Sequence, residues 1–499
     1  MSRASTAELQ EWIPPLLLSV LVLLIGVAIA VLPWSWALLL VAAPALALVL
    51  IVRPELALCL LAFAVPFGSI WEWPLGPVNV SVTELLVVAL GLSWAARMLS
   101  NRRLVVPQPP LLVPLVVLLF AFSLSILASS SLPLSVRELV KWLEVLVVYL
   151  FMAARLDRRW GKWVVLSLLS AATLEALFGV YHFLWRVGPE GFVLFGRFMR
   201  AYGHFAQPNP FAGYLGLSIP LCLGLGLWSL EMWASRRAQV GPAQPWAPWG
   251  AVGGSIYWAA FAAMLVAIVM SWSRGGWIGV GAALLVVTVA RSRRALLAVL
   301  VAAVLVAVVL SAGGTDYVPS WLAERFAGLL PYVSGVDVTR VDINDANWAV
   351  IERLAHWSAA VGMFADHPWL GVGIGNYAVA YGDYALGRWR DPLGHAHNYF
   401  LNVAAEAGIV GLLAYLAFVA AAIVEAWRAV QPPFASEANA VESAYWRAVA
   451  LGGLGVLVHL LVHSLFDNLY VHSMNVQVGL VLGLLAVAQR RAHDNAHRV

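Results

Sequence analysis

Long apolar runs follow one another along most of this chain, and most of them are long enough to cross a lipid bilayer. A membrane-spanning helix needs roughly 20 mainly apolar residues. Fourteen candidate runs can be read, although the first three are divided only by Pro33-Trp34 and Arg53-Pro54, so twelve or thirteen spans is an alternative. The runs are 14–32, 35–52, 55–70, 82–99, 111–128, 136–154, 162–185, 208–230, 252–272, 275–291, 294–311, 398–426, 445–466 and 470–489. We therefore expect an all-α, polytopic transmembrane helix bundle of twelve to fourteen spans.

The composition excludes a soluble globular protein. Of the 499 residues, 62% are hydrophobic and only 11% are charged, whereas soluble domains carry about 25% charged residues. Both cysteines, Cys59 and Cys222, lie in apolar runs, which excludes a disulfide framework and a cysteine-based metal site. The first apolar run lacks a small-residue cleavage site, so we expect it to be retained as a span.

The distribution of basic residues predicts the orientation in the membrane. With the N-terminus inside, 19 of the 30 basic residues fall in cytoplasmic segments, six in short outer segments and five in one long outer loop. Short cytoplasmic loops are enriched in Lys and Arg, so both termini are expected to be cytoplasmic, in a cytoplasmic (inner) membrane. The isoelectric point near 9.1 then reflects the cytoplasmic loops. We expect membrane lipids, and no nucleic acid, as partners.

Four regions follow from this reading: N-terminal transmembrane helices (1–190), helices with arginines at the outer face (191–311), a large external loop (312–397), and C-terminal helices with a cytoplasmic tail (398–499). The loop is expected to be mostly helical and precedes the last three spans. Apolar residues recur within it every three to four positions, which predicts an amphipathic helix over 346–365. They are Trp348, Ile351, Leu354, Trp357, Val361 and Phe364. The Gly371-Val-Gly-Ile-Gly375 segment is interpreted as a tight turn where backbone closely approaches a helix or ligand.

Three polar segments are predicted at the outer face. The first contains Arg200-Ala-Tyr-Gly-His-Phe-Ala-Gln-Pro-Asn209, preceded by Arg197. The second is Ser273-Arg274-Gly275. The third closes the long loop with His397-Asn398 and, after nine residues, Gly408-Ile-Val-Gly411. Ionisable residues at a membrane boundary indicate a functional site, and histidine titrates near neutral pH.

Together and in this order, the three segments resemble the O-antigen ligase and polymerase superfamily of bacterial envelope glycosyltransferases. That family has an R-x-x-G-x-F-x-x-x-N segment, an S-R-G segment, and a large periplasmic loop ending in H-[N/S/Q]-x9-G-x-x-G/T/Y. The resemblance covers about residues 190 to 425. It implies transfer of a glycan from an undecaprenyl-diphosphate carrier to an acceptor hydroxyl on the outer face of the membrane, as in lipopolysaccharide biosynthesis. The implied reaction inverts the anomeric centre and needs no metal or other cofactor.

The resemblance also implies roles for individual residues. His397 matches the catalytic position and would act as the general base. Arg200 and Arg274 match the diphosphate-binding arginines, with Arg197 as a nearby auxiliary. Guanidinium groups suit this role because they stay charged and bind phosphate oxygens in pairs. His204, Asn209 and Asn398 are further candidates for substrate binding.

Simpler interpretations stand beside these. His397 could cap the returning helix, and Asn209 could be an N-cap. His395 and His397, with Asp383 and Asp391 upstream, could bind zinc. Within the superfamily, a polymerase would use a second lipid-linked glycan as the acceptor. A polysaccharide transporter or flippase is the alternative from another class, although such proteins show repeated halves, and no internal repeat is visible here.

Cysteine labelling in intact cells tests the predicted orientation. A membrane-impermeant thiol reagent should modify a cysteine placed at position 345, in the long outer loop, and should leave one at position 235, in a cytoplasmic segment, unmodified until the membrane is opened. The opposite pattern would invert the topology and place the polar segments in the cytoplasm.

Overall fold

The structure is a computed structural model. It describes residues 44–68, 71–75, 78–102, 107–194, 196–240, 248–311, 337–344, 347–431 and 440–490. The predicted span 14–32 and the first part of the predicted external loop, 312–336, lie outside the described residues.

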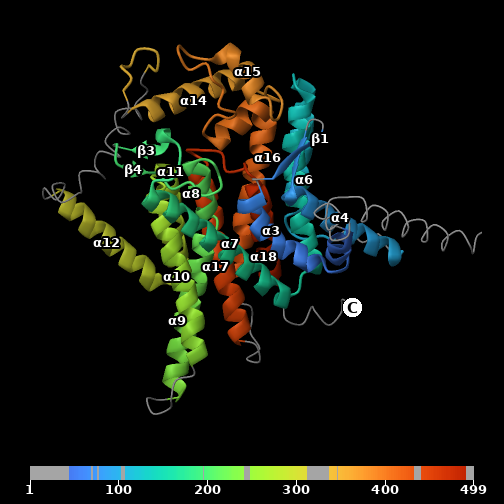
Figure 1. Cartoon of the computed structure of the whole chain (residues 1–499), viewed down its shortest axis with the longest axis vertical. Helices are drawn as coiled ribbons and strands as arrows, with labels where there is room; N and C mark the ends of the chain where they lie inside the picture. The colour runs from blue at the N-terminus through green and yellow to red at the C-terminus, as the bar shows by residue number, and fades with distance from the viewer. Residues whose placement is uncertain are drawn as a thin grey trace, which may run out of the picture.

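The described chain is a helix bundle, as predicted, with two small β-hairpins (Figure 1). The helices are α3 (Pro54–Gly68), α4 (Val82–Ser100), α5 (Leu112–Ser125), α6 (Leu132–Arg155), α7 (Arg158–Trp185), α8 (Pro208–Gly216), α9 (Ile219–Val240), α10 (Pro248–Met270), α11 (Arg274–Arg291), α12 (Arg293–Ser311), α14 (Trp348–Asp366), α15 (Tyr377–Tyr384), α16 (Tyr399–Val430), α17 (Ala440–His463) and α18 (Met474–Gln489). The hairpins are β1 (Glu72–Leu75) with β2 (Val78–Ser81), and β3 (Val193–Leu194) with β4 (Phe198–Met199).

The protein is a multi-pass membrane protein. Six of the described helices are long and apolar enough to cross a bilayer, or up to seven if the bent pair Pro44–Val52 and Pro54–Gly68 forms one span. Three further apolar helices, Leu112–Ala128, Gly254–Met270 and Met474–Gln489, are shorter. The predicted span 14–32 and the first half of the predicted span 35–52 lie outside the described residues, so the count of six or seven refers to the described part of the chain alone.

Helix α17 lies inside the bundle and packs against α9, α11, α16 and α18. Small residues allow these backbones to approach closely. A Cβ atom at Gly224 of α9 would lie 2.5 Å from the carbonyl oxygen of Ala448 in α17, and one at Gly452 would lie 2.5 Å from Cα of Leu221. Close packing through small residues is the usual way in which membrane helices associate, since burial of apolar surface gives little advantage in lipid.

The helix predicted over 346–365 is present as α14, and it lies with α15 at one end of the bundle (Figure 1). Its buried face differs from the expected one. Ile351 is buried as predicted, but Trp348 and Val361 are exposed. The buried face is formed instead mainly by small residues and one methionine, namely Ala355, Ala359, Ala360 and Met363. The difference arises because α14 packs on α15 and α16 through small residues, so the largest apolar side chains do not define the packed face.

The glycine-rich segment after α14 packs directly on α16, as predicted for a tight turn. Val372 N donates to Ala405 O (2.9 Å), and Ile409 N donates to Pro368 O (2.8 Å). Gly408 breaks α16 at this point with φ of 60° and ψ of −163°. A Cβ atom on Gly408 would overlap the carbonyl group of Trp369, so glycine is required here by both conformation and space.

Replacing Gly408 should therefore destabilise the protein. Gly408→Ala forces a side chain into a left-handed conformation and against Trp369, and we expect a loss of about 1–3 kcal/mol. Thermal unfolding in detergent should show a lower apparent Tm. Gly382→Ala is the matched control, since Gly382 lies in α15 with no atom within 4 Å of the added Cβ. An unchanged Tm for Gly408→Ala would contradict the role of the helix break.

Candidate active site

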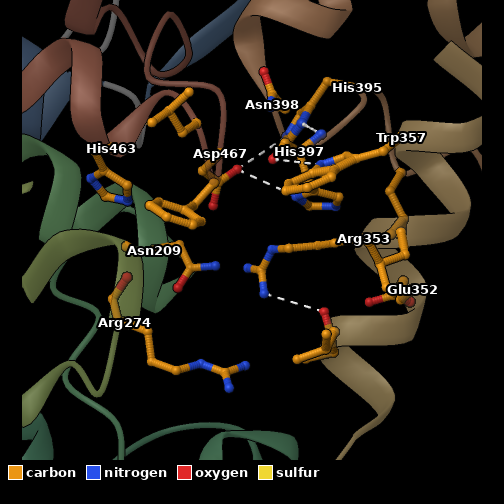
Figure 2. Close-up of a pocket in the computed structure, with 18 of the residues that line it drawn as sticks. Asn209, Arg274, Glu352, Arg353, Trp357, His395, His397, Asn398, His463 and Asp467 are labelled. Carbon is orange, nitrogen blue, oxygen red and sulfur yellow. Dashed lines mark hydrogen bonds and ion pairs between the residues drawn. The ribbon is translucent and has the colours of Figure 1, made fainter. Parts of the chain in front are cut away.

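A cavity of about 970 Å³ lies between α14 and the adjoining ends of the bundle helices (Figure 2). Five of the seven residues singled out in the sequence line it, although they come from segments far apart in the chain. They are Arg200, Asn209, Arg274, His397 and Asn398. Helix α14, the turn before α11, the loop before α16 and the loop after α17 also contribute to its walls.

Arg200 is held in place by hydrogen bonds to the loop before α11 and to α8. Its Nε donates to Ser271 O (2.9 Å) and its Nη2 donates to Asn209 Oδ1 (3.0 Å). Asn209 is not the N-cap of α8, because that position belongs to Gln207. Asn209 therefore orients Arg200 within the first polar segment, and the hydrogen bond to Ser271 O links this segment to the loop before α11.

Arg274 occupies the first turn of α11, and its guanidinium group points into the cavity (Figure 2). Ser273 is the N-cap of this helix and accepts a hydrogen bond from Gly276 N (3.4 Å). A Cβ atom at Gly276 would lie 2.8 Å from Cβ of Ala212 in α8. The Ser-Arg-Gly-Gly sequence thus begins a helix that packs closely on α8, and the helix N-terminus adds partial positive charge beside the arginine.

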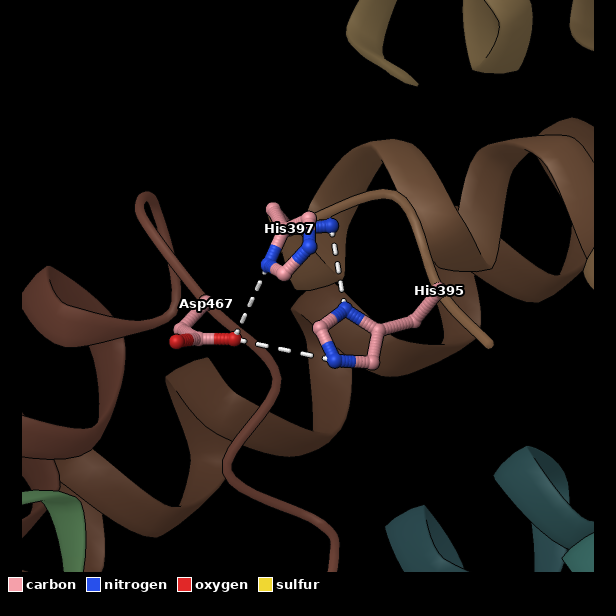
Figure 3. Close-up of side chains that lie close together, drawn as sticks. All are labelled: His395, His397 and Asp467. Carbon is pink, nitrogen blue, oxygen red and sulfur yellow. Dashed lines mark hydrogen bonds and ion pairs between the residues drawn. The ribbon is translucent and has the colours of Figure 1, made fainter. Parts of the chain in front are cut away.

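His397 lies where the loop turns into α16, with φ of 52°. Its backbone is fixed on two sides, since its N–H donates to His395 Nδ1 (3.1 Å) and its carbonyl accepts from Trp357 Nε1 (3.4 Å). Nδ1 of the ring lies 3.4 Å from Asp467 Oδ1 (Figure 3). Nε2 is buried and has no hydrogen-bond partner among the described residues. Backbone strain at a residue held by several partners is typical of functional sites.

Asn398, and not His397, caps α16. Its side-chain oxygen accepts from Phe400 N (3.0 Å) and Leu401 N (3.1 Å). The capping interpretation of His397 is therefore wrong for the structure, because the adjacent residue already satisfies the first amides of the helix.

Asp467 is the residue that sequence reasoning missed. It comes from the loop after α17, is 6% exposed, and contacts both His397 and His395, the latter at 3.7 Å from Nε2. Burial opposes its ionisation, but the hydrogen bond and charge of His397, followed by the charges of His395 and Arg353, hold the pKa of Asp467 well below its usual range. The signal available was a polar break between two apolar runs, with His463 and Asp467 four positions apart.

Two neighbouring histidines are poor candidates for charge changes near neutral pH. Burial, followed by the charge of His397, lowers the pKa of His356 to about 4. Burial also lowers the pKa of His395 to about 4, although the Asp467 carboxylate opposes this. Both imidazoles are therefore neutral at pH 7.

Comparison with protein families adds independent information. Residues 259–416 match the O-antigen ligase family. This part of the chain is similar to O-antigen ligases. The match includes Arg274 and His397 but neither Arg200 nor Asp467. A search of curated proteins gave no match to the chain.

Two of the predicted site residues lie outside the cavity. His204 does not line the cavity, and its Nδ1 lies 2.7 Å from Oε2 of Glu175, which is completely buried in α7. Arg197 is exposed at the β3–β4 turn, with its guanidinium group 5.2 Å from the ring centre of Phe198. Both residues belong to the segment that carries Arg200, and neither lines the cavity.

The structure changes the set of residues that could bind zinc. His395, His397 and Asp467 offer ligand atoms that all lie within 4.8 Å of one another, so these three residues could hold a metal ion (Figure 3). Among the described residues, neither Asp383 nor Asp391 belongs to this group. The carboxylate comes from the loop after α17 and not from the histidine loop.

Proposed function

We propose that this protein is an O-antigen ligase-like glycosyltransferase that transfers a glycan from an undecaprenyl-diphosphate carrier to an acceptor hydroxyl. The family domain implies a lipid-linked glycan as substrate. The observation that carries the proposal is that His397, whose Nε2 has no partner among the described residues, lines one cavity together with Arg200 and Arg274. We place this cavity at the outer face of the cytoplasmic membrane, with both termini in the cytoplasm, from the distribution of basic residues.

His397 is the proposed general base. Asp467 accepts the Nδ1–H hydrogen bond and so fixes the tautomer whose Nε2 can accept a proton. The acceptor hydroxyl gives its proton to Nε2 while its oxygen bonds to the anomeric carbon. The bond between that carbon and the carrier's phosphate oxygen breaks, and its electron pair leaves with the diphosphate. One in-line displacement of this kind inverts the anomeric centre.

The arginines act on the leaving group. Breaking the sugar–phosphate bond places additional negative charge on the diphosphate, and fixed positive groups stabilise this charge without reorganisation. Arg200 is pre-positioned by Ser271 and Asn209, and Arg274 is placed by the first turn of α11. We infer that these two side chains bind the carrier's diphosphate, and that no step requires a metal ion.

Replacing His397 should separate binding from chemistry. His397→Ala should lower turnover by about 10²–10⁴-fold, the usual contribution of a general base, and leave donor affinity nearly unchanged. The assay uses purified protein with a lipid-linked oligosaccharide and candidate acceptors, and it follows release of the polyprenyl diphosphate. Normal turnover of the variant would exclude His397 as the base.

Two controls accompany this measurement. His367→Ala removes an exposed imidazole that does not line the cavity and should leave turnover unchanged. Incubation with a chelator should also have no effect. Activity that is lost with chelator and restored by zinc would instead assign His395, His397 and Asp467 to a metal site.

Replacing Arg274 should weaken binding and chemistry together, since a phosphate contact acts in both the ground state and the transition state. Arg274→Ala should raise the donor Kd and lower kcat, and Arg274→Lys should recover only part of each because an ammonium group lacks the paired donors. Titration with donor and single-turnover kinetics measure the two effects. Arg291→Ala is the control, because Arg291 lies at the other end of α11 and pairs with Glu231 near the surface. It should change neither the donor Kd nor kcat. An Arg274→Ala enzyme with unchanged Kd and kcat would refute the role of Arg274 in binding diphosphate.

A further inference from the structure

The proposed base belongs to a cluster of metal-binding side chains. The cluster consists of His395, His397 and Asp467, whose ligand atoms all lie within 4.8 Å of one another (Figure 3). The two histidines precede α16 and the aspartate follows α17, so two separate loops supply the three groups. In the described part of the chain, no other group of three or more His, Cys, Asp or Glu side chains has this spacing.

The distances within the cluster resemble those around a tetrahedral zinc ion. Asp467 Oδ1 lies 3.4 Å from His397 Nδ1 and 3.7 Å from His395 Nε2. Zinc binds nitrogen and oxygen ligands at about 2.0–2.2 Å, so ligands at the corners of a tetrahedron lie about 3.3–3.6 Å apart. The first distance falls in this range and the second is slightly longer. Small movements of the side chains would therefore complete the geometry.

The cluster is shielded from solvent but can be reached from the cavity. All three residues line the cavity, although the side chains of His395, His397 and Asp467 are only 18%, 17% and 8% exposed. Imidazole nitrogen and carboxylate oxygen are common zinc ligands, and three protein ligands leave a fourth position for water. The cavity provides both a path for the ion and space for that water.

Zinc would change which nitrogen of each imidazole carries the proton. In the structure, His397 Nδ1 faces Asp467, and His395 Nδ1 accepts from His397 N, which leaves the proton of a neutral His395 on Nε2. A metal bonds to a nitrogen lone pair. When zinc bonds to His397 Nδ1 and His395 Nε2, the proton of His397 moves to its Nε2 and that of His395 to its Nδ1. No proton is released overall, and His395 Nδ1 can no longer accept from His397 N.

We propose that His395, His397 and Asp467 form an inhibitory zinc site. The inhibition rests on the proposed function, because a metal on Nδ1 leaves a proton on Nε2 of His397, and this nitrogen can then no longer accept the proton of the acceptor hydroxyl. Loss of the hydrogen bond from His397 N also removes one of the contacts that fix its backbone. Arg200 and Arg274 are not ligands of the zinc, so the donor still binds while turnover stops.

The first experiment measures zinc binding without reference to turnover. Zinc is titrated calorimetrically into metal-free, full-length protein in detergent. His395→Ala and Asp467→Asn should each raise the Kd at least about tenfold, because even a group that only orients a metal ligand contributes about 10–100-fold to affinity. Asp467→Asn keeps the size of the side chain, so the test does not depend on a single variant. His367→Ala is the matched control, since it removes an exposed histidine outside the cluster, and it should leave the Kd unchanged.

The second experiment follows turnover of the wild type as zinc is added. Turnover should fall with a midpoint near the measured Kd, the donor Kd should stay the same, and excess chelator should restore activity. An unchanged zinc Kd in both cluster variants would overturn the site. Zinc that binds the cluster without slowing turnover would overturn the inhibition.

Two further outcomes separate this proposal from the proposed function. A protein that is inactive without metal and active with zinc would overturn the inhibition and make the metal catalytic. A protein that binds zinc at the cluster but transfers no glycan, with or without metal, would remove the proposed function and with it the inhibition, and would leave the zinc site in place.

Discussion

The site depends on a junction at which the loop after α17 meets the start of α16. Tyr399 N donates to Ser464 O (2.8 Å), and two residues earlier His397 Nδ1 faces Asp467 Oδ1 (3.4 Å). Asp467 is almost completely buried, and electrostatic interactions are stronger where water is excluded. The junction therefore fixes the imidazole between two loops and leaves Nε2 without a hydrogen-bond partner among the described residues.

The same junction explains why the cavity is chemically asymmetric. The Asp467 carboxylate contacts His397 at one side of the cavity, and three arginines line other parts of the same space. An acceptor hydroxyl needs a proton acceptor and a departing diphosphate needs positive charge. In the proposed reaction, His397 meets the first requirement and the arginines meet the second. Figure 3 shows that Asp467 faces both His397 and His395.

Backbone packing holds the α14 side of the cavity on the bundle. The break at Gly408 lets the segment after α14 form hydrogen bonds with α16 through Pro368 and Ala405. Inside a membrane protein an irregular backbone is tolerated only where its polar groups find partners. The arrangement of α14, and with it Arg353 and Trp357, therefore depends on a glycine that lies 55 positions beyond Arg353.

The sequence by itself determined the class of fold, the presence of α14 and five of the residues that line the cavity. Each of these follows from local signals: apolar runs of bilayer length, a three-to-four-residue period, and short polar segments at span ends such as Ser273-Arg274 and His397-Asn398. The buried face of α14 was less well predicted, because hydropathy does not specify which neighbour a helix contacts.

Only the tertiary structure decided which residues meet. Asp467 lies 70 positions after His397, and Glu175 lies 29 positions before His204. No local sequence pattern predicts either of these two contacts, because both depend on how the helices pack. The packing brought Arg353 into the cavity, took His204 out of it, and gave the capping role to Asn398. The period of apolar residues in the sequence indicates which face of a helix is buried. It does not indicate which other helix or loop contacts that face, and the candidate site depends on those contacts.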